Sequence, residues 1–219
     1  MRTDRLILAA ALGVALSWSS LSPASAEPWK QQGDWLVRAR GLVVAPNEDA
    51  SIRPIGGNVS INNSFVPELD FTYFMTNNLA LELILATTPH DAKALGTSVG
   101  DVDLGHVWLI PPTLSLQYHF DPLTELGISP YLGVGINYTI FHREDTPGDV
   151  VTDSSFDNSF GYALQAGVDV PLGGNFFLNA DVKRLWLDTD ASFETTVGHV
   201  DADVTIDPWI VGLGVGYKF

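Results

Sequence analysis

The last eleven residues of the chain alternate between large apolar side chains and small or polar ones. The large set is Trp209, Val211, Leu213, Val215, Tyr217 and Phe219, and the intervening set is mostly glycine. Successive side chains of a β-strand point to opposite faces, so a period of two places these sets on opposite faces of one strand. One unbroken apolar face opposite a small, polar face suits a sheet whose outer surface meets lipid. The pattern favours a membrane-spanning strand.

The final residue separates this interpretation from its main alternative. The buried last strand of a soluble sandwich would explain the alternation, but not why the chain ends on an aromatic residue. An aromatic last residue preceded by alternating apolar positions resembles the C-terminal signal strand by which bacterial outer-membrane barrels are recognised for assembly. We therefore expect Tyr217 and Phe219 to form a signal for the barrel assembly machinery.

The N-terminus has the pattern of a cleavable secretory signal. Two arginines precede an apolar run from Leu6 to Leu16, and Ala24-Ser25-Ala26 offers a cleavage site. That run is too short to cross a bilayer as a helix, which needs about 20 residues. We expect residues 1–26 to be removed and residues 27–219 to form a single outer-membrane domain. The chain has no cysteine, so disulfides cannot stabilise it after export.

Eight segments of the mature chain show a period of two. They lie near residues 34–45, 65–75, 79–89, 113–120, 129–141, 159–170, 175–189 and 205–219. Connections after the odd-numbered segments are long, and those after the second, fourth and sixth are short and rich in residues that reverse a chain. This alternation is typical of barrels with both termini on the periplasmic side. The predicted fold is all-β, an eight-stranded antiparallel up-and-down transmembrane β-barrel.

Polar side chains recur in one phase of these segments, and apolar side chains in the other. In segment 159–170, for example, Gln165 and Asp169 fall opposite Leu164 and Val168. The alternative is a soluble lipocalin-type barrel, which lines its interior with aliphatic residues and keeps polar residues outside. Carboxylates such as Glu68 would be costly in a small closed core unless they were paired. We therefore assign the apolar phase to lipid.

The formal net charge is −15 at pH 7, which makes nucleic acid a poor partner. Much of the acid lies in four segments in which we find no strand periodicity and which we expect to be external loops. They are residues 46–64, 90–112, 142–158 and 190–203. Acidic loops are usually only solvated, but beside lipopolysaccharide they could also bind divalent cations.

Several stretches resemble the outer membrane protein W (OmpW) family of small Gram-negative porin-like barrels. The likeness is carried by Pro111-Pro112-Thr113-Leu114 with Gln117-Tyr118-His119-Phe120, by residues 130–139, by Asp188-Thr189, and by Ile206-Asp207-Pro208-Trp209 with Gly216-Tyr217-Lys218-Phe219. The resemblance implies an eight-stranded barrel with a narrow, partly hydrophobic channel, which passes small hydrophobic molecules toward a lateral opening in the barrel wall.

One departure from this family concerns segment 175–189, where Lys183 and Arg184 stand at positions that are aromatic in other members. Lys183 falls in the inward phase and Arg184 in the outward phase, so either a bulge resets the register or Arg184 lies near an interface. A cation near the constriction would make a charged gate, paired with Asp181 or Asp169. The alternative is a salt bridge that fills and closes the barrel. Both remain open, and the resemblance favours a pore.

A catalytic interpretation is weaker. The sequence has no Gly-x-Ser-x-Gly nucleophile motif. His119 could meet Asp70, Glu68 and Ser115 inside the barrel, but such a set is more often a hydrogen-bond network. Short acidic and histidine series at residues 101–106 and 199–203 are best explained as solvated loop residues rather than metal ligands. We predict no enzyme activity, no catalytic residue, no metal site and no cofactor.

The sequence thus predicts a narrow passive outer-membrane channel for small, mainly hydrophobic molecules. The expected lumen-lining residues are Asp70, Thr72, Phe74, Ile84, Gln117, His119, Asn137, Gln165, Asp181 and Lys183. Trp108, Leu109 and Ile110 are expected to form an external mouth. The alternative function is a non-conducting barrel whose acidic loops mediate binding or adhesion. Expected partners are outer-membrane lipid and lipopolysaccharide, the assembly machinery and small hydrophobic solutes, with no nucleic acid.

Overall fold

The computed structural model describes residues 29–219 except 121, 124–126, 146–149 and 197. The predicted signal, residues 1–26, lies outside the described residues. In the part that the structure describes, no helix is long and apolar enough to cross a membrane.

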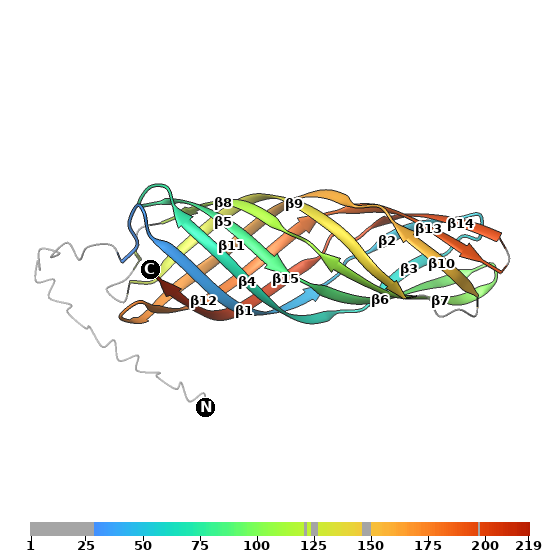
Figure 1. The fold of residues 1–219 in the computed structure, drawn as a ribbon, viewed down its shortest axis with the longest axis horizontal. Helices are drawn as coiled ribbons and strands as arrows, with labels where there is room; N and C mark the ends of the chain where they lie inside the picture. The colour runs from blue at the N-terminus through green and yellow to red at the C-terminus, as the bar shows by residue number, and fades with distance from the viewer. Residues whose placement is uncertain (1–28, 121, 124–126, 146–149, 197) are drawn as a thin grey trace, which may run out of the picture.

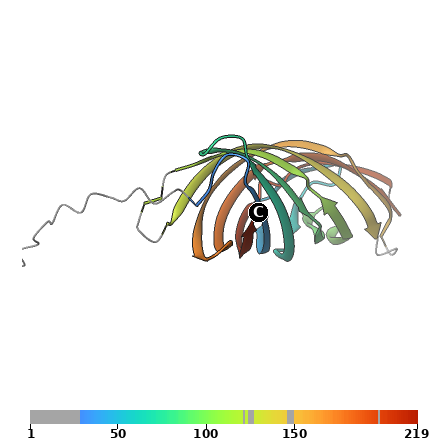
Figure 2. The ribbon, with the colours of Figure 1, turned by 60° about the vertical axis from the view of Figure 1, so that its left-hand side comes forward.

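Eight antiparallel strands close into a barrel, which confirms the predicted fold (Figure 1). They are β1 (Trp35–Ala45), β4 (Ser64–Phe74), β5 (Leu79–Ala86), β8 (Thr113–His119), β9 (Ser129–Asp145), β11 (Ser159–Gly173), β12 (Phe176–Trp186) and β15 (Trp209–Lys218). Each strand pairs with the next, and β15 pairs with β1 from Leu36–Lys218 to Ala45–Trp209, which completes the closure. The C-terminus lies at the end of the barrel that carries the short turns, which we call the turn end. Figure 2 brings this end forward.

The four acidic segments do not form loops, and this expectation was wrong. They contain seven further strands: β2 (Asp49–Arg53), β3 (Asn58–Ile61), β6 (Thr88–Thr97), β7 (Gly100–Ile110), β10 (Val151–Phe156), β13 (Asp188–Thr195) and β14 (Gly198–Thr205). The strands β3, β6 and β7 continue the barrel sheet through the far end of β9, and β10, β13, β14 and β2 form a second sheet. Together they extend the barrel beyond the end opposite the C-terminus (Figure 1). We call these seven strands the extension.

The period of two is present in these extensions, but the acidic residues obscure it. In β14, the buried Val200, Ala202 and Val204 alternate with exposed polar residues that include Asp201 and Asp203. Outside the bilayer the outward face meets water, so carboxylates are tolerated there and the outward phase is not apolar. The inward side chains of the extension pack into an apolar core that includes Leu104, Phe141 and Phe193.

The outer surface of the barrel is apolar. Large exposed aromatic side chains lie at both ends of the spanning strands. Those at the turn end include Trp35, Tyr73, Tyr118, Phe120, Phe176 and Phe219, and those at the other end include Tyr138, Phe160, Tyr162, Trp186 and Trp209. Aromatic girdles of this kind mark the two membrane interfaces of outer-membrane barrels.

The register of β12 is continuous through Arg184, which pairs with Leu164 on one side and Trp209 on the other. The structure therefore has no bulge at this position. The Arg184 guanidinium lies 5.2 Å from the centre of the Trp209 ring and donates to the backbone carbonyl of Asp207. Arg184 thus belongs to the aromatic interface, which was the second of the two interpretations.

The narrow interior requires glycine where a large side chain crosses it. Tyr131 on β9 is 1% exposed, and its phenol ring occupies the space that a Cβ at Gly167 on β11 would take. The neighbouring Ala166 projects from the opposite, lipid-facing side of β11. Gly167 therefore permits the ring to cross the barrel.

We expect Gly167→Val to lower the free energy of unfolding by about 1–3 kcal/mol, because the added side chain overlaps the Tyr131 ring. Ala166→Val should change it by less than about 0.5 kcal/mol, because its side chain faces lipid. Urea titration of both variants in lipid vesicles measures the difference. Equal destabilisation by the two substitutions would contradict the assignment of faces.

Candidate functional site

Two arginines on β1 organise the interior of the turn end of the barrel. Arg38 is fully buried, and its guanidinium donates to Asp70 Oδ1 at 2.7 Å, Glu82 Oε1 at 2.8 Å and Thr72 Oγ1 at 2.6 Å. These acceptors lie on β4 and β5, so one side chain links three strands. The Arg38 guanidinium has five N–H donors, which suits it to bind several carboxylates at once.

Arg40 lies two residues further along the same face of β1. Its Nε donates to Glu68 Oε1 at 2.6 Å, and its Nη1 donates to Asn179 Oδ1 on β12 at 3.2 Å. Its Nη2 lies 3.2 Å from Asp70 Oδ2 and 3.4 Å from Glu82 Oε1. Asp70 and Glu82 are therefore shared by both guanidinium groups, which makes the cluster a network rather than a set of separate pairs.

A second group of polar side chains lies closer to the turns. Lys30, from the segment before β1, enters the barrel and donates to Asp169 Oδ2 at 2.7 Å and to Ser129 Oγ at 3.0 Å. Its ammonium also lies 2.8 Å from His119 Nδ1, and His119 Nε2 lies 2.9 Å from Gln117 Oε1. Asn179 bonds Asp169 Oδ1 at 2.8 Å and so joins this group to the arginine network.

Charged side chains fill the barrel between the turn end and the chamber described below. We call them the ionic layer: the carboxylates of Glu68, Asp70, Glu82, Asp169 and Asp181 and the cations of Lys30, Arg38, Arg40 and Lys183, which are all buried. Leu36, Phe74 and Phe177 pack beneath it at the turn end. An eight-stranded barrel is only wide enough for its own side chains. The structure therefore closes the periplasmic half, which corresponds to the plugged alternative left open by the sequence.

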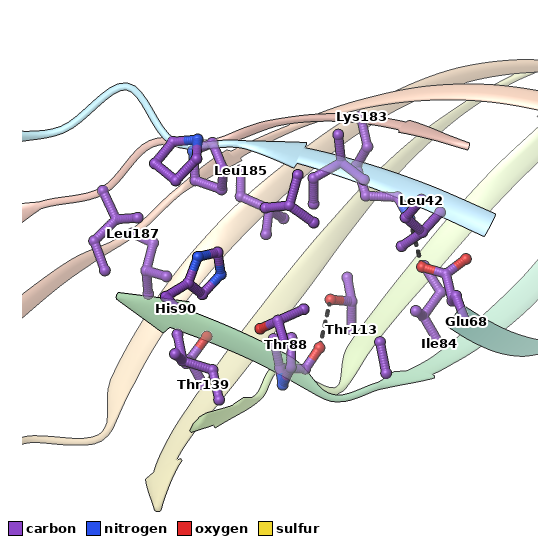
Figure 3. Close-up of a pocket in the computed structure, with 18 residues that line it drawn as sticks. Leu42, Glu68, Ile84, Thr88, His90, Thr113, Thr139, Lys183, Leu185 and Leu187 are labelled. Carbon is purple, nitrogen blue, oxygen red and sulfur yellow. Dashed lines mark hydrogen bonds and ion pairs between the residues drawn. The ribbon is translucent and has the colours of Figure 1, made fainter. Parts of the chain in front are cut away.

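An apolar chamber lies directly above the ionic layer (Figure 3). It is a cavity of about 50 Å³ whose walls include Leu42, Val44, Leu185 and Ile210, while Lys183 and Glu68 form its floor. Further out, two smaller cavities of about 40 Å³ and 20 Å³ lie within the apolar core of the extension. The chamber and the 40 Å³ cavity are both lined by Leu109 and Ile206. The 40 Å³ and 20 Å³ cavities are both lined by Leu104 and Phe193. Three small apolar cavities thus follow one another from the core of the extension to the chamber.

His90 on β6 lines the chamber from the extension. Its Nδ1 lies 3.1 Å from Ser64 Oγ and 3.2 Å from the carbonyl oxygen of Asn62. Burial lowers the pKa of His90 below its usual value, and the Asn62 hydrogen bond only partly opposes this. The imidazole is therefore neutral at neutral pH, so the upper part of the chamber carries no charge.

The barrel wall is interrupted beside the chamber. The backbone pairing of β5 with β8 ends at Ile84–Thr113. The strands β6 and β7, which follow β5 and precede β8 in the chain, pair in the same register from Thr88–Leu109 onward. Between these points, residues 85–87 and 110–112 are not paired with each other. Pro111 and Pro112 have no N–H to donate, which explains the break. We call this break the wall gap.

Side chains from inside the barrel satisfy the carbonyl groups at the wall gap. The Asn137 amide donates to the carbonyl oxygens of Pro111 at 3.2 Å and Pro112 at 3.3 Å, and to Thr113 Oγ1 at 2.9 Å. The backbone N–H of Tyr138 also donates to Pro112. The proline segment is thus fixed to β9 on one side and unpaired with β5 on the other.

The ten residues predicted to line the lumen are all buried within the barrel. Seven of them, Asp70, Thr72, Phe74, Gln117, His119, Gln165 and Asp181, lie in the ionic layer or pack against it. Ile84 and Lys183 line the chamber, and Asn137 holds the wall gap. These residues thus lie in or against the ionic layer, beside the chamber and at the wall gap, and their role in a lumen stays a prediction.

The predicted external mouth lies elsewhere. Trp108, Leu109 and Ile110 belong to β7 where it joins the barrel, close to the chamber and not at the external end. Leu109 is buried and lines the chamber, whereas Ile110 is 37% exposed on the outer face. This part of the prediction was wrong because the connection is a strand, so its side chains alternate between the interior and the surface.

Sequence analysis missed three cations of the ionic layer, Lys30, Arg38 and Arg40. It also missed Tyr131 and Asn179, which donate hydrogen bonds to carboxylates of the layer. A signal was available for the arginines, because Arg38 and Arg40 are two residues apart and share a phase with Leu36. The catalytic alternative is not assembled, since His119 contacts Lys30 and Gln117 and not Asp70, Glu68 or Ser115. Among the described residues, no group of three or more His, Asp or Glu side chains is arranged to hold a metal ion.

An eight-stranded closed barrel with an apolar outer surface between two aromatic girdles is the architecture of integral outer-membrane proteins. The chain is such a protein, from the outer membrane of a Gram-negative bacterium. The chain belongs to the OmpW family, whose model matches residues 31–219. It is 43% identical over 188 residues to an uncharacterized outer-membrane protein of Sinorhizobium fredii, covering 84% of this chain and 80% of that protein. It is 33% identical over 198 residues to outer membrane protein W of Vibrio cholerae, covering 86% of this chain and 90% of that protein. The crystal structure of OprG from Pseudomonas aeruginosa matches with a TM-score of 0.79 and 29% identity, over 87% of this chain and 97% of that one.

We expect Arg38→Met to destabilise the barrel by about 3–5 kcal/mol, because it leaves buried carboxylates without their cation. Arg53→Met is the matched control, since Arg53 pairs with Asp203 in an exposed pair of the extension, and it should cost less than about 1 kcal/mol. The thermal unfolding midpoints of the two variants in detergent measure this. A small effect at Arg38 would contradict the structural role of the ionic layer.

Proposed function

We propose that the protein is a passive channel for small, mainly hydrophobic molecules, which enter at the external end and leave sideways into the outer membrane. The observation that carries this proposal is the position of the wall gap at the level of the chamber. Ala86 and Pro111 lie in the gap, and Thr88 and Thr113 flank it. All four also line the cavity. A molecule in the chamber is therefore separated from lipid by a stretch of wall without a hydrogen-bond ladder.

The ionic layer supports a lateral exit over a straight path to the periplasm. An apolar molecule that crossed this layer would have to separate buried ion pairs and leave their charges unpaired, which is costly in a low-dielectric interior. The wall gap has no such barrier, because the pairing that would have to be broken there is already absent. The apolar core of the extension, with its cavities, supplies the route from the external end.

We also propose partners for the outer surface and the C-terminus. The exposed aliphatic and aromatic side chains would contact outer-membrane lipid and lipopolysaccharide. Tyr217 and Phe219, whose ring centres lie 4.7 Å apart, would be read by the barrel assembly machinery during insertion.

A bulky side chain at the wall gap should block transport. We expect Ala86→Trp to reduce uptake of a radiolabelled polycyclic hydrocarbon by intact cells to the level of cells without the protein. Ala86 is half-buried beside both chamber and gap, so the indole would occupy the exit. Leu83→Trp is the matched control, because Leu83 lies on the same strand and faces lipid with 40% exposure.

Both variants would first be shown to be folded and present in equal amounts. Unchanged uptake with Ala86→Trp would overturn the lateral route. Equal uptake by wild-type cells and cells without the protein would instead favour a non-conducting barrel that acts through its acidic extension.

A further inference from the structure

The floor of the apolar chamber carries one charged donor that the protein itself does not satisfy. Lys183 on β12 is 2% exposed and lines the cavity. Its Nζ lies 3.8 Å from Glu68 Oε2 and 3.8 Å from Asp181 Oδ1, which is close enough for ion pairing but too far for hydrogen bonds. Within the described part of the chain, Nζ has no hydrogen-bond acceptor in reach. Figure 3 shows the end of the Lys183 side chain next to Glu68.

An ammonium group has three N–H donors, and burying them without acceptors is costly. Three of the other polar groups around the chamber already have partners. Glu68 accepts from Arg40, Thr113 from Asn137, and His90 lies in hydrogen-bond range of Ser64. Lys183 is therefore the group on the chamber floor from which a ligand with an acceptor atom would gain a strong, charge-assisted hydrogen bond.

The charge of the ionic layer restricts the chemistry of that acceptor. The layer contains five carboxylates and four cations, and Lys183 is one of the four. With all groups ionised, the layer has one excess negative charge. A ligand carboxylate would add a second negative charge a few ångströms from Glu68 and Asp181, whereas a neutral oxygen would accept from Lys183 without this repulsion.

We propose that the chamber floor is a recognition site for the neutral oxygen of an apolar molecule, such as an alcohol, ketone, aldehyde or ester. The Lys183 ammonium donates to that oxygen, and the hydrocarbon part contacts Leu42, Leu185 and Ile210. This inference rests on the proposed function for the route into the chamber, and it names the class of molecule that the chamber selects. Plain hydrocarbons pass the same chamber but gain no hydrogen bond there.

Photoaffinity labelling of the full mature protein in lipid nanodiscs tests the site directly. The probes are a medium-chain primary alcohol, the corresponding alkane and the corresponding carboxylate, each with a diazirine at the same carbon. They are compared at equal concentrations in the bilayer, and labelled residues are mapped by peptide mass spectrometry. We expect the alcohol to label chamber residues about tenfold more than the alkane, the effect of one hydrogen bond to a charged group.

Lys183→Met keeps the length of the side chain and removes its donors, so the ratio of alcohol to alkane labelling should fall to about one. Lys183→Arg, which retains donors and charge, should restore part of the preference. Lys93→Met is the matched control, because Lys93 is exposed on the extension and should leave the ratio unchanged.

The outcomes separate this inference from the proposed function. Equal labelling by alcohol and alkane in the wild-type protein overturns the oxygen site but leaves the channel in place. Preference for the carboxylate probe overturns the neutral-oxygen assignment. A preference that persists in Lys183→Met overturns the role of Lys183. Labelling of the chamber by none of the probes in the wild-type protein overturns the route into the chamber, and with it both proposals.

Discussion

The pairing of Arg38 and Arg40 with the carboxylates of Asp70 and Glu82 is the interaction on which the rest of the interior depends. Strands facing lipid must place their polar residues inside, and a barrel of eight strands has no room for water to solvate those charges. The carboxylates therefore need cations within bonding distance, and two guanidinium groups with forked donors provide them. This requirement closes the periplasmic half and confines any passage to the part above it.

The apolar chamber follows from the position of this boundary. Above Arg40 the inward residues of β1 are Leu42 and Val44, and those of β12 above Lys183 begin with Leu185. An apolar molecule that reaches the chamber from outside finds charge below it and apolar wall around it. Lys183 lies on the boundary, with its carbon stem beside the apolar walls and its ammonium over the ionic layer. A molecule with both a hydrocarbon part and an oxygen matches that arrangement.

The sequence predicted the spanning strands well because lipid demands an unbroken apolar phase, and β8 (Thr113–His119) lies almost where the alternation placed it. The extension escaped prediction because water replaces lipid there, so Asp201 and Asp203 occupy the outward phase of β14 without cost. The ionic layer could be predicted as a set of inward polar residues but not as a network. Whether Arg38 reaches Glu82, 44 residues away, depends on strand register and barrel shear, which a period of two does not contain.

Prolines interrupt the hydrogen-bond ladder of the wall at two places, and the two interruptions are bridged differently. At Pro208 hydrogen bonds bridge the interruption in the pairing of β12 with β15. The Leu185 N–H donates to the Pro208 carbonyl, and the Leu187 N–H donates to the Asp207 carboxylate at 3.0 Å. At Pro111 and Pro112 the available donor, Asn137, lies on β9 and binds the carbonyls from inside, so nothing bridges to residues 85–87. The same loss of backbone donors therefore leaves a hydrogen-bonded seam in one case and an unbridged stretch of the ladder in the other. What decides the outcome is the strand from which the replacement donor comes.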